Sequence, residues 1–253
     1  MNHIQSLESP ANALLHHGSH SPKLLVSVRD VSEIEDAIAG GADWIDFKEP
    51  HDGPLGAVSS NQACQMVRVV DSRLPVSAAL GELIDWQSAP SQQLLKIPGI
   101  DVVKLGLAGC ASLRNWESTW QDLYQQAADH GKQMAAVAYA DWSRAEAPSP
   151  DAVLEAAIKT GASYLLIDTW DKRSRSTLDC FNPEELAGLV KHVRSSEIRT
   201  VLAGNLRLAD ISSAVELETD ILAVRGAACR GDRTDTINYQ AVRAIKRAIV
   251  SAR

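Results

Sequence analysis

The stretch Gly40-Gly41-Ala42-Asp43-Trp44-Ile45-Asp46-Phe47-Lys48 contains the pattern that decides the fold. Its two glycines predict the end of a helix, because glycine readily takes the left-handed backbone conformation that closes one. Asp43 then leads into a short strand over residues 44–48. Similar joints occur at residues 98–101, 160–163 and 217–220. A helix end followed by a short strand, repeated along the chain, indicates a series of βα units.

Eight short apolar runs fit this pattern, and most are continuous blocks, which are typical of parallel strands covered on both faces. We expect strands at Leu24–Val28, Trp44–Lys48, Val76–Leu80, Val102–Leu105, Met134–Tyr139, Tyr164–Asp168, Thr200–Ala203 and Ile221–Val224. Amphipathic segments predict helices at Val31–Ala39, Asn61–Val70, Leu113–His130, Ala152–Thr160, Pro183–Val193, Asp210–Leu217 and Ile237–Val250.

The spacing of these runs predicts one domain. Strand starts recur about every 28 residues, close to the length of one βα unit. Eight units in about 230 residues predict a single (β/α)8 TIM barrel over residues 23–253, an α/β fold that typically takes about 250 residues. A doubly wound sheet is the alternative, but it usually has fewer strands, and its Gly-rich fingerprint is missing from the sequence.

The composition is that of a folded protein without a nucleic-acid or membrane partner. Hydrophobic residues make up 45% and charged residues 23% of the 253 residues, whereas disordered chains are more polar. The 25 Lys and Arg against 32 Asp and Glu give a formal net charge of −7, which does not attract nucleic acid or anionic lipid. No apolar run approaches the roughly 20 residues needed to span a bilayer, and no secretory signal is recognisable, so we expect a cytoplasmic protein.

The N-terminal residues 1–22 are polar and unpatterned, which predicts a disordered or loosely docked extension. Its His16, His17 and His20 are better explained by a solvated tail than by a metal site. The four cysteines contain no C-x-x-C pair and are expected to be reduced thiols; they are Cys64, Cys110, Cys180 and Cys229. The sequence leaves the oligomeric state open, a homo-oligomer included.

A barrel places its chemistry at the carboxyl ends of the strands. Period-2 alternation puts Asp46 and Lys48 on the same face, and Lys104 is a single cation in the strand at Val102–Leu105. Such groups are costly to desolvate, so they indicate either a functional site or a salt bridge that only satisfies the interior. Two neighbouring ammonium groups disfavour each other's charge, which lowers the pKa of one of them. A lysine with a low pKa can act as a Schiff-base nucleophile.

Further candidates stand at the later strand ends. Asp168 ends the sixth strand, and the run Lys172-Arg173-Ser174-Arg175 follows it; the run could clamp a phosphate, although a solvated loop is the commoner role of such a run. The loops after the seventh and eighth strands often bind phosphate in barrel enzymes. They provide the candidates Gly204, Asn205, Arg225, Gly226 and Ala227. Glu82 and Asp141 also follow strands and could line the mouth, although a surface position is the commoner one for such carboxylates. No G-x-S-x-G nucleophile elbow occurs.

Several motifs together identify a family. They include Asp46-Phe47-Lys48-Glu49-Pro50 and Gly53-Pro54-Leu55-Gly56-Ala57, with further matches at residues 24–28, 40–43, 103–106, 167–169, 172, 202–204, 206, 224–227, 229 and 231–233. Over about residues 23–250 the chain resembles the (5-formylfuran-3-yl)methyl phosphate synthase family of methanofuran biosynthesis.

The resemblance implies that two molecules of glyceraldehyde 3-phosphate are condensed to a furan aldehyde phosphate, with loss of phosphate and water. It implies a Schiff base on Lys48 and acid/base catalysis by Lys104, with Asp46, Asp168 and Lys172 at the remaining polar positions. It implies no metal and no organic cofactor. Two alternatives stay open from the residues alone: a Schiff-base aldolase that acts on a sugar phosphate, and a phosphate-binding scaffold barrel without catalysis.

Overall fold

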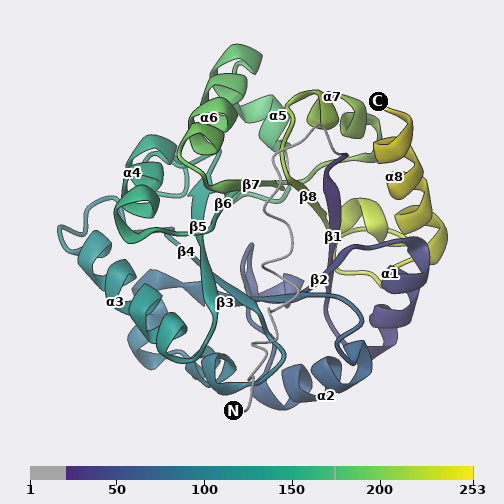
Figure 1. Cartoon of the computed structure of the whole chain (residues 1–253), viewed down its shortest axis with the longest axis horizontal. Helices are drawn as coiled ribbons and strands as arrows, with labels where there is room; N and C mark the ends of the chain where they lie inside the picture. The colour runs from purple at the N-terminus through teal and green to yellow at the C-terminus, as the bar shows by residue number, and fades with distance from the viewer. Residues whose placement is uncertain (1–20, 174, 253) are drawn as a thin grey trace, which may run out of the picture.

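The computed structural model describes residues 21–173 and 175–252. They form a closed barrel of eight parallel strands in which each strand pairs with the next in sequence and β8 pairs with β1 (Figure 1). The strands are β1 (Lys23–Val28), β2 (Trp44–Phe47), β3 (Val76–Glu82), β4 (Val102–Gly106), β5 (Gln133–Tyr139), β6 (Tyr164–Asp168), β7 (Arg199–Leu202) and β8 (Ile221–Val224). The prediction of a (β/α)8 barrel is therefore confirmed.

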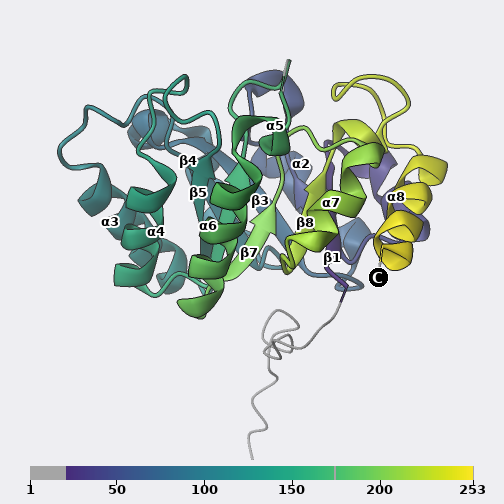
Figure 2. The same ribbon diagram turned by 90° about the horizontal axis from the view of Figure 1, so that it is seen from above.

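Helices form the outer ring of the barrel, as Figures 1 and 2 show from two directions. They are α1 (Ile34–Gly40), α2 (Ser60–Val70), α3 (Trp116–Asp129), α4 (Pro150–Thr160), α5 (Thr177–Cys180), α6 (Pro183–Ser195), α7 (Ile211–Glu216) and α8 (Tyr239–Ser251). Short 3-10 helices are η2 (Val31–Glu33), η3 (Pro50–Asp52), η4 (Leu83–Ser88), η5 (Pro90–Lys96), η6 (Leu208–Asp210) and η7 (Gly226–Ala228).

The unit after β3 differs from the others because two 3-10 helices, η4 and η5, replace an α-helix. Pro90 starts η5, and Ala89 before it is extended (φ −72°, ψ 125°). A residue that precedes proline is pushed out of the helical region, so a continuous helix cannot cross this point. The short α5 was not predicted from the sequence. The remaining differences from the predicted bounds are small, since no strand end moves by more than two residues.

The repeated joints have a common hydrogen-bonding role. At the start of β2, the side chain of Asp43 accepts the backbone N–H of Leu24 in β1 at 2.7 Å. Asp101 does the same for Val76 at 2.8 Å. Asp220 accepts the N–H of Thr200 at 2.7 Å. Each aspartate thus ties the first or second residue of one strand to the start of the neighbouring strand, which helps to fix strand register at the amino-terminal end of the barrel.

The interior of the barrel is apolar at one end and charged at the other. Near the strand starts, Trp44 and Tyr164 pack edge to face with ring centroids 6.0 Å apart. Further along the strands, Asp46 and Lys104 are 0% and 5% exposed. The fold therefore presents a buried charged layer toward the carboxyl ends of the strands.

Two expectations concern the parts of the chain outside the barrel. The predicted N-terminal extension lies outside the described residues except for Ser21 and Pro22, and so do His16, His17 and His20. Within the described ranges, no helix has the length and apolar character needed to cross a membrane.

The aspartate joints generate a stability prediction. Asp220→Ala leaves the N–H of Thr200 without its acceptor, so we expect the free energy of unfolding to fall by about 1–3 kcal/mol. Asp220→Asn keeps an acceptor oxygen and should lose less. Urea unfolding followed by circular dichroism measures both changes, and equal losses in the two variants would contradict the assigned role of the side chain.

Candidate active site

The first charged pair of the barrel interior joins β2 and β4. Lys104 Nζ lies 2.6 Å from Asp46 Oδ1. The same carboxylate accepts hydrogen bonds from the hydroxyls of Ser27 and Ser77, each at 2.7 Å. Asp46 is therefore held by one cation and two hydroxyls from three different strands, and Lys104 is fixed at a short distance from it.

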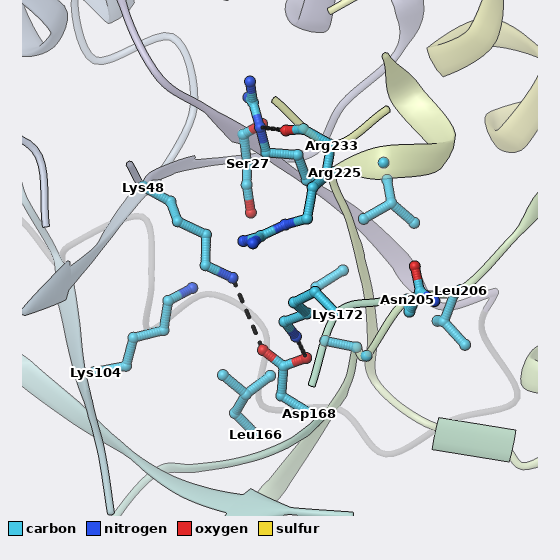
Figure 3. Close-up of a pocket in the computed structure, with 15 residues that line it drawn as sticks. Ser27, Lys48, Lys104, Leu166, Asp168, Lys172, Asn205, Leu206, Arg225 and Arg233 are labelled. Carbon is cyan, nitrogen blue, oxygen red and sulfur yellow. Dashed lines mark hydrogen bonds and ion pairs between the residues drawn. The ribbon is translucent and has the colours of Figure 1, made fainter. Parts of the chain in front are cut away.

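The second charged cluster is centred on Asp168 at the end of β6 (Figure 3). Lys172 Nζ donates a hydrogen bond to Oδ1, which also accepts the N–H of Thr169 at 2.8 Å. Lys48 Nζ lies 3.8 Å from Oδ2, a longer contact than that between Lys104 and Asp46. Oδ2 has no hydrogen-bond partner among the described residues. This oxygen and the Lys48 amine can therefore both reach a ligand placed between them.

Burial changes the protonation of these groups. The net pKa of Lys48 is lowered to about 7, and burial is the largest cause; the Lys172 and Lys104 cations also lower it, whereas the carboxylates of Asp168 and Asp46 oppose the shift. The repulsion between lysines that the sequence suggested is thus present, but burial is the larger cause. Burial also lowers the pKa of Lys172. It acts to raise the pKa of Asp168, but Lys172 and Lys48 outweigh it and the net pKa is lowered.

These groups line a narrow cavity of about 40 Å³ at the carboxyl ends of the strands. Five candidate residues come from the family resemblance and five more from the loops after the seventh and eighth strands. Eight of these ten line the cavity: Lys48, Lys104, Asp168, Lys172, Gly204, Asn205, Arg225 and Gly226. The other two do not line it. Asp46 is completely buried beside Lys104, and Ala227 packs against the apolar core.

Arg225 has a structural role that the sequence did not indicate. Its guanidinium forms a bidentate ion pair with the buried Glu33, at 2.8 and 3.1 Å. It also donates to the backbone oxygens of Ser27, Arg233 and Asp235. All five N–H groups of an arginine are accounted for by these contacts, so the side chain has no donor left for a phosphate.

The two loop glycines differ in how closely the protein packs around them. Gly204 has φ +91°, and a Cβ there would lie 2.0 Å from Thr177 Oγ1. The fold itself therefore demands glycine at this position. A Cβ on Gly226 would be 3.6 Å from its nearest neighbour, Arg233. Packing therefore leaves room for a larger residue there, on the wall of the narrow cavity.

The arginines after Lys172 do not line the narrow cavity. Arg173 pairs with Asp171 and its side chain is 86% exposed. Arg175 donates to the backbone oxygen of Asp179. Among the described residues of this run, Lys172 lines the narrow cavity, and Arg173 lines a larger cavity beside it.

The two weaker carboxylate candidates are less exposed than expected. Tyr139 donates to Glu82 at 2.6 Å, and burial raises the pKa of Glu82. Asp141 accepts the N–H groups of Trp170 and Asp171 at 2.6 and 2.9 Å, which braces the loop after β6. In the described part of the chain, no three or more His, Cys, Asp or Glu side chains are grouped to hold a metal ion.

A family model described as 4-HFC-P synthase matches residues 24–246. The chain belongs to this family. A (5-formylfuran-3-yl)methyl phosphate synthase of Methanocaldococcus jannaschii is 34% identical over 229 residues, covering 88% of this chain and 97% of the relative. One from Methanosarcina barkeri is 30% identical over 227 residues, covering 87% and 96%. Membership of the 4-HFC-P synthase family indicates an enzyme.

Solved structures support the fold of this 4-HFC-P synthase family member. The 3-hexulose-6-phosphate synthase from Salmonella typhimurium superposes with a TM-score of 0.61 at 16% identity, covering 91% of this chain and 100% of that chain. A thiamine phosphate pyrophosphorylase from Pyrococcus furiosus gives 0.59 at 15% identity, covering 92% and 98%. At such identities the likeness concerns the barrel alone.

Sequence reasoning missed four residues that shape the site: Ser27, Glu33, Ser77 and Arg233. Ser27 and Ser77 interrupt apolar strands at the level of Asp46, a signal that the register would have revealed. Glu33 lies in the first turn after β1 and looks like a surface carboxylate in the sequence. Arg233 belongs to a motif of the family resemblance, but nothing in its neighbourhood in the sequence shows that it reaches the cavity.

The Lys48 environment generates a titration prediction. We expect Lys48 to titrate at about pH 7. Lys172→Gln removes a nearby cation and should raise this pKa, whereas Asp168→Asn removes a stabilising anion and should lower it. Competitive acetylation across pH, read by peptide mass spectrometry, measures the midpoint. A midpoint near the usual value of about 10.4, or shifts of the same sign in both variants, would rule out this electrostatic account.

Proposed function

We propose that this protein is a (5-formylfuran-3-yl)methyl phosphate synthase that forms its product from two molecules of glyceraldehyde 3-phosphate. The atoms balance when one phosphate and two waters leave for each furan aldehyde phosphate made. The product would serve the biosynthesis of methanofuran or of a similar one-carbon carrier. The observation that carries the proposal is the buried Lys48, with a pKa of about 7, beside Asp168 in a cavity that Lys104 and Lys172 also line.

Lys48 would act as the nucleophile. At a pKa of about 7, roughly half of the amine is neutral at pH 7, against about one part in a few thousand for an ordinary lysine. A neutral amine adds to the substrate aldehyde and forms a carbinolamine, and loss of water gives the iminium. Asp168 Oδ2, which faces Lys48 without a hydrogen-bond partner, would accept a proton or a hydroxyl hydrogen bond during this step.

The iminium explains how phosphate can leave. It withdraws electrons from the adjacent carbon, so a base can remove the proton there and phosphate departs from the next carbon by β-elimination. Aldol-type condensation with the second triose phosphate and loss of water then complete the ring. We assign proton transfer to Lys104, with Lys172 as the second cationic group near the reacting carbons.

The phosphate of the Schiff-base substrate would lie against the loops after β7 and β8. Gly204, Asn205 and Gly226 line the cavity there. Gly226 leaves space above the backbone, so an anion can approach the main chain closely. Because the guanidinium of Arg225 is fully used by the protein, we propose that this residue supports the loop and does not bind phosphate through its side chain.

The proposal predicts a covalent intermediate on Lys48. Borohydride added with glyceraldehyde 3-phosphate should trap an adduct on the Lys48 peptide, detectable by mass spectrometry. Lys104→Ala should still allow trapping while stopping product formation, because its role comes after imine formation. An unmodified Lys48 peptide, or normal turnover in Lys48→Ala, would refute the mechanism. The Schiff-base aldolase alternative is tested by product: a furan aldehyde absorbs in the ultraviolet and should appear together with free phosphate.

The phosphate loop is tested by Gly226→Ala. The added methyl group meets no protein atom closer than 3.6 Å, so we expect a free energy of unfolding within about 0.5 kcal/mol of wild type. We expect the substrate concentration for half-maximal trapping of Lys48 to rise by about tenfold, since the methyl occupies space assigned to phosphate. Gly204→Ala is the contrasting variant and should lose about 1–3 kcal/mol through backbone strain. If the concentration for half-maximal trapping is unchanged in Gly226→Ala, the phosphate does not bind at this loop.

A further inference from the structure

The narrow cavity has a larger neighbour at the same end of the barrel. A second cavity of about 630 Å³ lies among the loops that follow β2, β3 and β6. Lys172 and Arg233 line both cavities, so they stand at the boundary between them. The narrow cavity has a volume of about 40 Å³, much less than that of its neighbour. A second triose phosphate is therefore more easily placed in the larger cavity.

Arg233 differs from the other cations of the mouth because it lacks a carboxylate partner. Lys104 pairs with Asp46, and Lys48 and Lys172 pair with Asp168. Arg233 is half-buried and makes no direct ion pair with any described residue; burial lowers its pKa, and the more distant carboxylates of Asp168 and Glu49 only partly oppose this shift. A partly buried charge without a counter-charge is costly, unless an anion arrives to compensate it.

The orientation of Arg233 is set by backbone contacts. Its Nη1 and Nη2 donate to the backbone oxygens of Pro50 and Gly53, each at 3.1 Å. These two bonds hold the guanidinium plane against the loop after β2 without neutralising its charge. Three of the five N–H groups of an arginine then remain for a ligand. A planar guanidinium with free donors is well suited to bind a phosphate group.

We propose that Arg233, together with Lys172, binds the phosphate of the second glyceraldehyde 3-phosphate in the larger cavity. This inference rests on the proposed function and adds a second substrate subsite to it. The first substrate is held by Lys48 and the loops at Gly204 and Gly226. The second would extend from Arg233 and Lys172 toward the iminium, so that its reacting carbons meet the first substrate beside Lys48.

The experiment compares wild type with Arg233→Gln in two assays over a range of glyceraldehyde 3-phosphate concentrations. Borohydride trapping on Lys48 reports the first substrate, and the rate of furan aldehyde formation reports both. In Arg233→Gln we expect the glyceraldehyde 3-phosphate concentration for half-maximal trapping to stay within about twofold of the wild-type value. We expect the concentration for half-maximal product formation to rise by about tenfold or more, as for loss of a charge-assisted hydrogen bond.

Two matched variants separate a specific contact from a general charge effect. Arg233→Lys keeps the charge and should recover part of the loss. Arg173→Gln removes the same charge from the larger cavity, but Arg173 is exposed and already paired with Asp171. We expect its half-maximal concentration for product formation to change by less than about threefold.

Three results would overturn the proposal. Unchanged product formation in Arg233→Gln, or equal weakening of trapping and product formation, would exclude a second-substrate role. A lower maximal rate without a change in half-maximal concentration would assign Arg233 to the departing phosphate instead. Absence of trapping in wild type would refute the Schiff-base function itself and is a separate outcome.

Circular dichroism would show whether Arg233→Gln is misfolded. If it is, the subsite is tested in the wild-type protein with inorganic phosphate as a competitor. We expect inorganic phosphate to inhibit product formation at concentrations that leave trapping on Lys48 unchanged. Parallel inhibition of both assays would overturn the proposal.

Discussion

The contact between Asp168 and its two lysines is the interaction on which the site depends. A carboxylate that is 1% exposed can remain ionised only if nearby cations repay its lost hydration. Lys172 does so by a direct hydrogen bond, and Lys48 by a longer contact of 3.8 Å. The looser partner is the one whose pKa falls to about 7. The carboxylate of Asp168 therefore stays ionised. Its long contact with Lys48 does not hold that amine in the protonated form.

The closed barrel makes this balance possible. Asp46, Lys104 and Asp168 come from strands that are far apart in sequence and meet only because β8 returns to β1. Below them, Trp44 and Tyr164 fill the barrel with apolar surface, which keeps the charged layer away from bulk water. A formal net charge of −7 for the whole chain thus coexists with a local excess of cations at the mouth.

Much of the architecture could be predicted because it is determined by local sequence patterns. The joints before the strands, the apolar runs and the alternation of Asp46 and Lys48 depend on residues near one another in sequence. Ion pairs across the barrel do not. Glu33 and Arg225 are 192 residues apart, and nothing local to Arg225 shows that its guanidinium is already occupied. For the same reason the sequence pointed to Arg173 and Arg175 as phosphate ligands and not to Arg233, whose position depends on how the loop after β8 meets the loop after β2.

The contacts of each lysine indicate that the three have different roles within the site. Lys104 is held at 2.6 Å by an aspartate that two serine hydroxyls also contact, so its position is fixed and suits repeated proton transfer at one carbon. Lys172 contacts Asp168 and lines both cavities. In the proposed reaction, a group at that boundary can contact both substrates. Lys48 is held less tightly than either of them, since its contact with Asp168 is 3.8 Å long. Its low pKa and this loose contact make it the lysine best suited to bond to a substrate.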